Sequence, residues 1–191
     1  KESLLVEFPK HPFWDFSLKV YTSDGVAEAC LELQNTHQLD VNILLFCLWY
    51  GASGRGKLND KEIKKIICHV DIWHRDVVKE LRKLRVLLKG GMKNAPAELT
   101  ISLRRSLQKI EIDAEHIEQL MLSTLIPAVE DASKDDRKKI EETISNISSY
   151  FAIFGTISTR DWKNLMVILE TVFPGQQLRG LSMDIETFVE S

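Results

Sequence analysis

Apolar side chains recur along this chain at the spacing of buried helices rather than of strands. In residues 13–21 the polar residues form only a narrow stripe, and large apolar side chains fill the other positions. A second such segment covers residues 26–33, and a third, residues 43–50, contains no charged side chain. A helix with so little polar surface is typically buried on most sides. We therefore predict a helical core that includes Trp14, Phe16, Phe46 and Trp49.

Two long helices are predicted in the middle of the chain. Asn59, with Glu62 three residues later, indicates a capping box that starts a helix running to about Lys89. Its apolar stripe consists of Val70, Trp73, Val77, Leu81, Leu84 and Leu88. A glycine pair at residues 90–91 ends this helix, and Pro96 opens a second one that runs to about residue 126. The short linker predicts that the two helices form an antiparallel hairpin.

Further helices are predicted over residues 133–154 and 160–173, the second capped by Ser158 with Asp161. The apolar stripe of the last helix is expected to pack either against the rest of the bundle, which we favour, or against a second copy of the chain. No segment shows the alternation of a strand. The fold class is therefore all-α: a single-domain helical bundle, residues 1–191, that contains a long antiparallel helical hairpin. Residues 128–191 are expected to form a C-terminal helical extension packed on residues 11–127.

Four segments resemble a known family: FWDFSLKVYTSDGVAEACLELQ, LDVNILLFCLW, WHRDVVKELRKLRVLLK and LRRSLQKIEIDAEHIEQLML. They are similar to a family of uncharacterised proteobacterial helical proteins of unknown function, and the resemblance covers about residues 11–125. Its signature is FW-x-FSL, GVAEACL and LDVN-x-LLF-x-x-W, taken together. The resemblance implies a short helical protein, and it implies no catalytic or ligand-binding residue.

Composition fits an ordinary globular chain, with 44% hydrophobic and 28% charged residues and a net charge of −3. The longest apolar run, residues 43–50, is too short for a membrane span of roughly 20 residues. Because no secretion signal is visible near Lys1, we expect a cytoplasmic protein. Three cysteines, Cys30, Cys47 and Cys68, lie in apolar helical patterns without paired spacing. We expect all three to be buried, reduced thiols.

No known catalytic pattern is complete in this chain, and we assign no catalytic, cofactor-binding or metal-binding residue. Residues 51–57 fit G-x-x-x-x-G-K, but Leu58 stands where a phosphate-binding loop needs Ser or Thr, and a helix precedes the motif instead of a strand. We interpret it as a helix connector. Asp71 with His74, and Asp113 with His116, are three residues apart on predicted helices. Either pair is close enough to be half of a site, and we interpret both as surface pairs.

Charge is segregated between the two long helices. Residues 75–109 carry ten Lys or Arg against three acids, whereas residues 110–131 carry six acids and no Lys or Arg. Folding the hairpin about Lys93 is expected to place Glu111 near Arg75. The cations then expected to stay unneutralised, and predicted to contact a partner, are Arg82, Lys83, Arg85, Lys89, Lys93, Arg104 and Arg105.

This basic tip favours a non-enzymatic interaction or regulatory protein that binds an acidic protein surface. Nucleic acid is a second class of partner, with weaker support, because no aromatic side chain lies among these cations to stack on bases. Two other functions stay open. One is a carrier or sensor that binds an apolar small molecule or acyl chain among the aromatic residues of the first helices, and the other is an enzyme of unknown class.

Overall fold

The computed structural model describes residues 7–126, 131, 134–176 and 178. Within these residues all regular structure is helical, which confirms the all-α class. The elements are α1 (Pro12–Tyr21), α2 (Val26–His37), α3 (Val41–Ala52), α4 (Asp60–Trp73), the π-helical turn η1 (His74–Val78), α5 (Lys79–Leu87), the 3-10 turn η2 (Leu88–Gly90), α6 (Ala97–Leu125), α7 (Asp136–Phe151) and α8 (Thr159–Val172). None of the described helices combines the length and the apolar character needed to cross a membrane.

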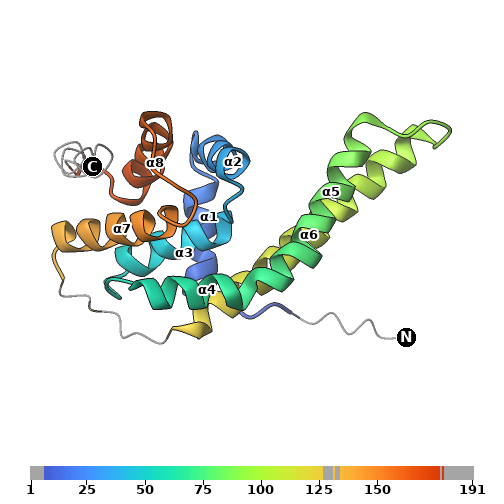
Figure 1. Cartoon of the computed structure of the whole chain (residues 1–191). Helices are drawn as coiled ribbons and strands as arrows, with labels where there is room; N and C mark the ends of the chain where they lie inside the picture. The colour runs from blue at the N-terminus through green and yellow to red at the C-terminus, as the bar shows by residue number, and fades with distance from the viewer. Residues whose placement is uncertain (1–6, 127–130, 132–133, 177, 179–191) are drawn as a thin grey trace.

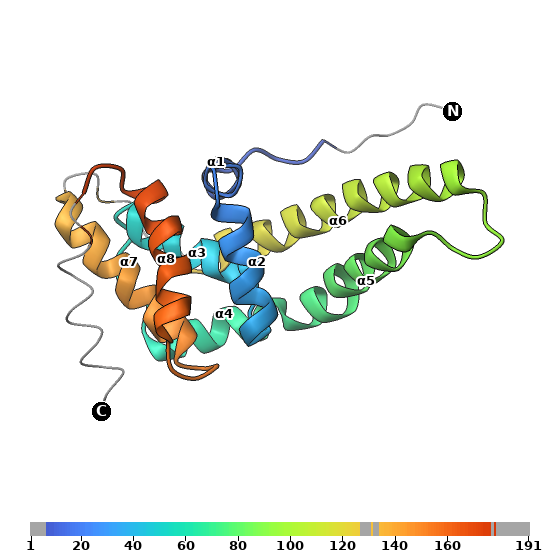
Figure 2. The same cartoon turned by 90° about the horizontal axis from the view of Figure 1, so that it is seen from above.

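The helices form a body and one projecting arm (Figure 1). In the body, α7 packs against α3 and α8 packs against α2, so the C-terminal helices cover the N-terminal ones. The segment α4–η1–α5 runs antiparallel to α6, and the two continue beyond the body side by side (Figure 2). We call residues 79–112 the arm; it comprises α5, η2, the connecting loop and the first half of α6.

Capping residues fix where several helices begin. The side chain of Asp40 accepts a hydrogen bond from the backbone N–H of Asn42 and starts α3. Asn59 forms the predicted capping box with Glu62 at the start of α4. A second predicted box, at Ser158, starts α8. The predicted start of a helix at residue 133 lies outside the described residues, and α7 begins at residue 136 behind an Asp N-cap.

The chain does not keep an α-helical period between α4 and α5, because η1 inserts a π-helical turn. Such a turn holds roughly one extra residue, which rotates everything after it by about 100° relative to a continuous α-helix. The predicted stripe is correct at Val70, which is buried. At the end of η1, Val78 is fully buried in place of Val77. On α5 the predicted stripe is wrong at Leu84, which is 50% exposed, whereas Leu81 is half-buried.

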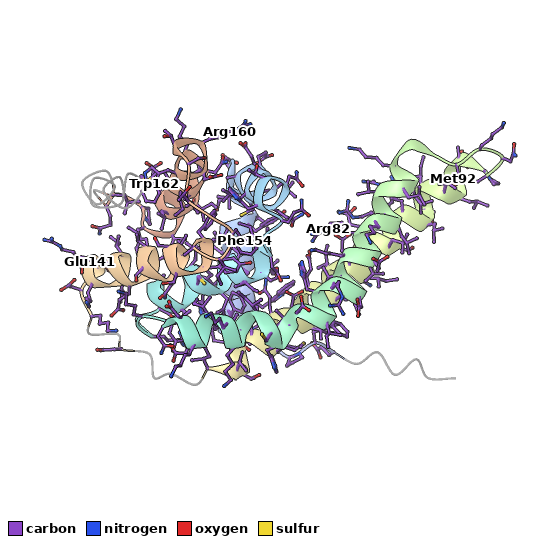
Figure 3. All side chains as sticks on the ribbon, in the orientation of Figure 1. Arg82, Met92, Glu141, Phe154, Arg160 and Trp162 are labelled. Carbon is purple, nitrogen blue, oxygen red and sulfur yellow. The ribbon has the colours of Figure 1, made fainter. Side chains whose placement is uncertain are left out.

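The same rotation decides which residues of α5 face α6. Arg82 lies at the base of the arm and Met92 lies near its tip (Figure 3). Arg82 contacts Glu111 of α6, and Trp73 donates its indole N–H to the carbonyl oxygen of Ala114. The predicted register, with Glu111 near Arg75, is wrong. The loop between η2 and α6, residues 91–96, nevertheless includes Lys93 near its centre, where the hairpin was predicted to fold.

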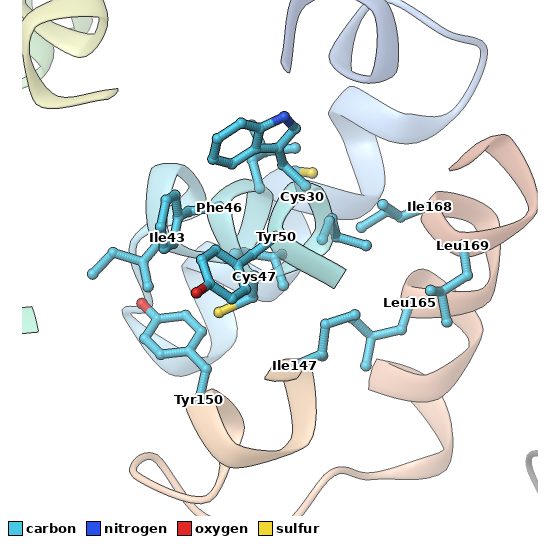
Figure 4. Packing of buried hydrophobic residues seen from close by; sticks show 14 of the residues in the cluster. Cys30, Ile43, Phe46, Cys47, Tyr50, Ile147, Tyr150, Leu165, Ile168 and Leu169 are labelled. Atoms are coloured by element: carbon cyan, nitrogen blue, oxygen red, sulfur yellow. The ribbon is translucent and has the colours of Figure 1, made fainter. Parts of the chain in front are cut away.

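The core is centred on α3, whose residues 42–51 are all buried (Figure 4). The ring of Phe13 meets those of Phe46 and Trp49, with centroids 5.4 Å and 5.2 Å apart. Phe46 and Trp49 are therefore core residues, as predicted. Trp14 and Phe16 are only half-buried: Phe16 packs against the edge of the core, whereas the assignment of Trp14 to the core is wrong. The inward face of α1 is narrower than the pattern indicated and consists of Phe13, Ser17 and Val20.

The three cysteines are free thiols in different environments. Cys30 and Cys47 are buried, and burial raises the pKa of Cys30 to about 12, which leaves it protonated. Cys68 is exposed, so the prediction for this residue is wrong. On α4 the buried positions are residues 63, 66 and 70, and Cys68 points away from that face because each residue turns the helix by about 100°.

Candidate functional site

The arm carries a concentration of exposed apolar side chains. Nine of the fifteen large hydrophobic side chains that are exposed among the described residues lie on it. Three of them, Leu99, Leu103 and Ile110, follow one another at intervals of four and seven residues and therefore share one face of α6. Leu99 is 68% exposed, more than any other large apolar side chain of the described chain. Contiguous apolar surface of this kind typically marks an interaction site.

Ion pairs neutralise the basic residues at the base of the arm. Arg82 contacts Glu111 at 2.9 Å and Glu115 at 2.6 Å, and it also donates a hydrogen bond to the side-chain oxygen of Gln34 on α2. Arg85 binds the same Glu111 carboxylate. Burial disfavours the charge of Glu111, but the bonds from Arg85 and Arg82 outweigh it and hold the pKa of this carboxyl below its usual value. The prediction that Arg82 and Arg85 lack neutralising partners is wrong.

The cations farther out differ from one another. Lys83 pairs with Glu80 of the same helix. Lys89, Lys93 and Arg105 are exposed, and no ion pair to them occurs among the described residues. Arg104 is half-buried, and its Nε has no hydrogen-bond partner. The basic tip is thus reduced to these last four cations, which lie in the outer part of the arm.

The segment that fits a phosphate-binding pattern serves packing. Gly51 belongs to α3 and lies against α7, where an added Cβ would come within 2.6 Å of the backbone of Thr143. Gly54 has a positive φ of 77°, and an added Cβ would lie 2.5 Å from the carbonyl oxygen of Asp131. A helix precedes the motif, as predicted, so the strand context of a phosphate-binding loop is not met.

A second feature, a cluster of buried polar residues, lies where α3, η1 and α6 meet. Nδ1 of His74 is 2.9 Å from Oδ2 of Asp40 and 3.2 Å from Oε2 of Glu118. Exposed fractions are 0% for Glu118, 7% for Asp40 and 8% for His74. The hydroxyl of Tyr150 accepts a hydrogen bond from the backbone N–H of Asp40 at 2.8 Å, which ties the cluster to α7. We call Asp40, His74 and Glu118 the buried triad.

The members of the buried triad perturb one another's protonation. Burial disfavours the imidazolium of His74, but hydrogen bonds to Asp40 and Glu118 outweigh it and raise the pKa of His74 to about 9. Burial, helped by the negative charge of Asp40, raises the pKa of Glu118 to about 9. For Asp40, burial is outweighed by hydrogen bonds with His74 and Glu118, which lower its pKa. At neutral pH the triad therefore holds a cationic His74, an anionic Asp40 and a protonated Glu118. Such a set can share protons or bind a cation.

Sequence reasoning missed this triad. It paired His74 with Asp71, which instead forms an exposed ion pair with Arg75, so the interpretation of His74 as half of a surface pair is wrong. The other proposed pair fails similarly: His116 is buried and stacks on Trp14, with ring centroids 3.9 Å apart. The carboxylates that meet His74 lie 34 and 44 residues away in the sequence. No local spacing could have found them.

Comparisons with known proteins identify a family but not a function. A search of curated proteins and a search of solved structures gave no match. A family model described as "Protein of unknown function (DUF2390)" matches residues 12–122. This range holds α1 to α5 and nearly all of α6, including the arm and the buried triad. It also lies within the residues 11–125 for which membership of an uncharacterised family was predicted. The chain therefore belongs to the DUF2390 family of proteins of unknown function.

Proposed function

We propose that this protein is a non-enzymatic interaction or regulatory factor that binds a protein partner through its arm. The observation that carries the proposal is the exposed apolar face of Leu99, Leu103 and Ile110 on a helical hairpin that stands away from the body. Removing such a face from water on binding is favourable by roughly 25 cal/mol per Å² of apolar area. The body of the protein leaves this face uncovered.

The spacing and charges of the arm indicate the kind of partner. Intervals of four and seven residues match the seam along which one amphipathic helix packs against another. The cations of the outer arm, Lys89, Lys93, Arg104 and Arg105, favour a partner that carries acidic side chains. We therefore propose an amphipathic helix with acidic flanks as the partner element.

The alternatives have less support. Nucleic-acid binding depends on cations that are free to meet phosphates, and Arg82 and Arg85 are engaged by Glu111 and Glu115. A carrier of apolar ligands needs aromatic side chains that line a cavity, whereas Phe13, Phe46 and Trp49 contact one another.

The proposal also covers the number of domains, the location of the protein and the sequence signature of its family. We propose one helical domain over residues 1–191, supported by the packing of α7 on α3 and of α8 on α2. We also propose a cytoplasmic location in proteobacteria, with FW-x-FSL, GVAEACL and LDVN-x-LLF-x-x-W as the family signature. Self-association through the arm is the competing form of the interaction.

The test replaces the apolar face and leaves the fold intact. Leu99→Gln, Leu103→Gln and Ile110→Gln are combined in one variant, because Gln is a good helix former. The matched control changes three exposed apolar residues of the body to Gln: Leu18, Leu31 and Ile153. Each protein is used to capture partners from host lysate, and the captured proteins are identified by mass spectrometry. We expect the arm variant to lose partners that the wild type and the control both retain.

A charge variant tests the cations of the outer arm. Lys89→Glu, Lys93→Glu and Arg105→Glu should weaken capture most at low salt, because exposed charges are screened at high salt. Arg82 stays unchanged, since a Glu at this position would face Glu111 and Glu115. Recovery of the same partners by the apolar-face variant would refute the proposal. Concentration-dependent dimers of the wild type that this variant does not form would favour self-association instead.

A further inference from the structure

The three side chains of the buried triad come from three separate elements and converge on one point. Asp40 is the N-cap of α3, His74 is the first residue of η1, and Glu118 lies on α6. One ligand atom from each lies within 4.8 Å of the others. Among the described residues no other group of three His, Cys, Asp or Glu side chains meets this distance. π-helical turns such as η1 frequently accompany functional sites.

We propose that Asp40, His74 and Glu118 bind one divalent first-row transition-metal ion. The ligands are Oδ2 of Asp40, Nδ1 of His74 and a carboxylate oxygen of Glu118. Binding of the ion displaces the protons of His74 and Glu118 into solvent. The neutral imidazole and two carboxylates that remain are a common ligand set for ions of the Zn²⁺, Mn²⁺ and Fe²⁺ class. The two carboxylates also carry the charge that balances a 2+ ion in a buried site.

The distances fit a shared ion. Metal bonds of about 2.1 Å place two ligand atoms about 3.0 Å apart at an angle of 90° and about 3.4 Å apart at the tetrahedral angle. The separations of Nδ1 from the two carboxylate oxygens are 2.9 Å and 3.2 Å, close to these values. Two of the three separations therefore suit one shared ion, and the third, between the oxygens of Asp40 and Glu118, is within 4.8 Å.

One oxygen of the triad has no hydrogen-bond partner: Oε1 of the fully buried Glu118. Oδ2 of Asp40 meets Nδ1 of His74 at 2.9 Å. Buried polar atoms are nearly always satisfied, so the unpaired oxygen needs an explanation. A bound ion supplies one when Glu118 binds through Oε1.

Neighbouring groups already hold the proposed ligands in place. The backbone N–H of Asn42 donates to Oδ1 of Asp40, which leaves Oδ2 turned toward His74. Tyr150 holds the backbone of Asp40, and Gln119 donates to the side chain of Asn42 at 2.9 Å. Supporting hydrogen bonds of this kind orient metal ligands in known sites. The ion would join α3, η1 and α6 at the base of the arm.

The test uses untagged full-length protein that has been freed of metal with a chelator. Binding of Zn²⁺ and of Mn²⁺ is measured by calorimetry, and metal retained after dialysis is counted by elemental analysis. Asp40→Asn removes the charge of one ligand and keeps a good N-cap. Glu118→Gln removes the charge of the second ligand and keeps its shape. His69→Gln and Asp71→Asn change exposed residues of α4 and are the matched controls.

We expect the wild type and the controls to bind one ion per chain, with a higher melting midpoint when the ion is present. Affinity should fall at least about 100-fold in Asp40→Asn and in Glu118→Gln, more than the loss of a supporting residue causes. Visible absorption of bound Co²⁺ provides a second readout on the folded wild type, even if a variant does not fold. A wild type that binds neither Zn²⁺ nor Mn²⁺ would overturn the proposal, as would equal binding by the wild type and both ligand variants.

Discussion

Gly51 offers a stringent test of the packing between α3 and α7. The substitution Gly51→Ala would place a Cβ 2.4 Å from Oγ1 of Thr143 and 2.6 Å from both its Cα and its backbone nitrogen. Two of these atoms belong to the backbone of α7, so a change of side-chain rotamer cannot relieve the contact. An ordinary contact begins near 3.4 Å, and the helices must therefore separate locally by about 1 Å.

Two opposing contributions set the magnitude. Ala is favoured over Gly inside a helix by about 1 kcal/mol. Overpacking a core usually costs about 1 to 3 kcal/mol, and backbone contact on both sides puts this site at the upper end. We expect Gly51→Ala to lower the free energy of unfolding by about 2 kcal/mol. For a chain of this length that corresponds to a melting midpoint lower by roughly 4 to 8 °C.

Urea denaturation and thermal melting, both followed by circular dichroism, measure the effect. Gly90→Ala is the matched control, because an added Cβ there meets no atom within 4 Å and the residue is exposed. The control should be neutral or slightly stabilising. A Gly51→Ala protein as stable as the wild type would show that α3 and α7 do not approach as closely as described.

Three further changes test the core, a helix start and the arm. Trp49→Ala should lower the free energy of unfolding by about 3 to 5 kcal/mol, because the side chain is buried; an unchanged urea midpoint would contradict this. Asp161 has a pKa held below its usual 3.8, because hydrogen bonds from Ser158 and His37 outweigh its burial. The ionised Asp161 side chain therefore stabilises the folded state above pH 3.8, and this stabilisation is lost as the pH falls through the lower pKa that Asp161 has in the folded protein. The urea midpoints of Asp161→Asn and the wild type should differ at pH 7 and begin to converge only below pH 3.8; a constant difference would refute the linkage. Arg82→Glu should destabilise the protein by about 3 kcal/mol, whereas Lys89→Glu should change the melting midpoint little, and equal effects would refute the ion pairs described for Arg82.

Local patterns in the sequence predicted the helices and several of their first residues. The capping boxes at Asn59 and Ser158 depend on residues three positions apart, so the sequence alone contains them. The burial of Phe46 and Trp49 was also predictable, because their helix has no polar face. Trp14 was misassigned for a related reason: a large aromatic residue beside a buried face looks like a core residue, and here it stacks on His116 at the surface of the core.

The candidate sites were less predictable, because they depend on contacts between distant segments. Arg82 was predicted to be unneutralised, because folding the hairpin about Lys93 was expected to place Glu111 near Arg75. Glu111 instead meets Arg82, and no residue in the sequence marks the π-helical turn that sets which side of α5 faces α6. The buried triad likewise requires the relative placement of three elements. Only the exposed end of the arm, with Lys89 and Arg105, keeps the character that the sequence indicated.

The π-helical turn couples the ion pairs of the arm to the type of helix that His74–Val78 forms. If these five residues were wound as an α-helix and none were removed, α5 would rotate by about 100°, Leu84 would move toward α6, and Arg82 would leave Glu111. Deleting one of the five would remove the extra residue together with the π-helical turn, and the residues after it would keep the faces that they have now. The arm should therefore tolerate the loss of one residue in η1, whereas the loss of one residue in α5 would turn every later residue of that helix by about 100°.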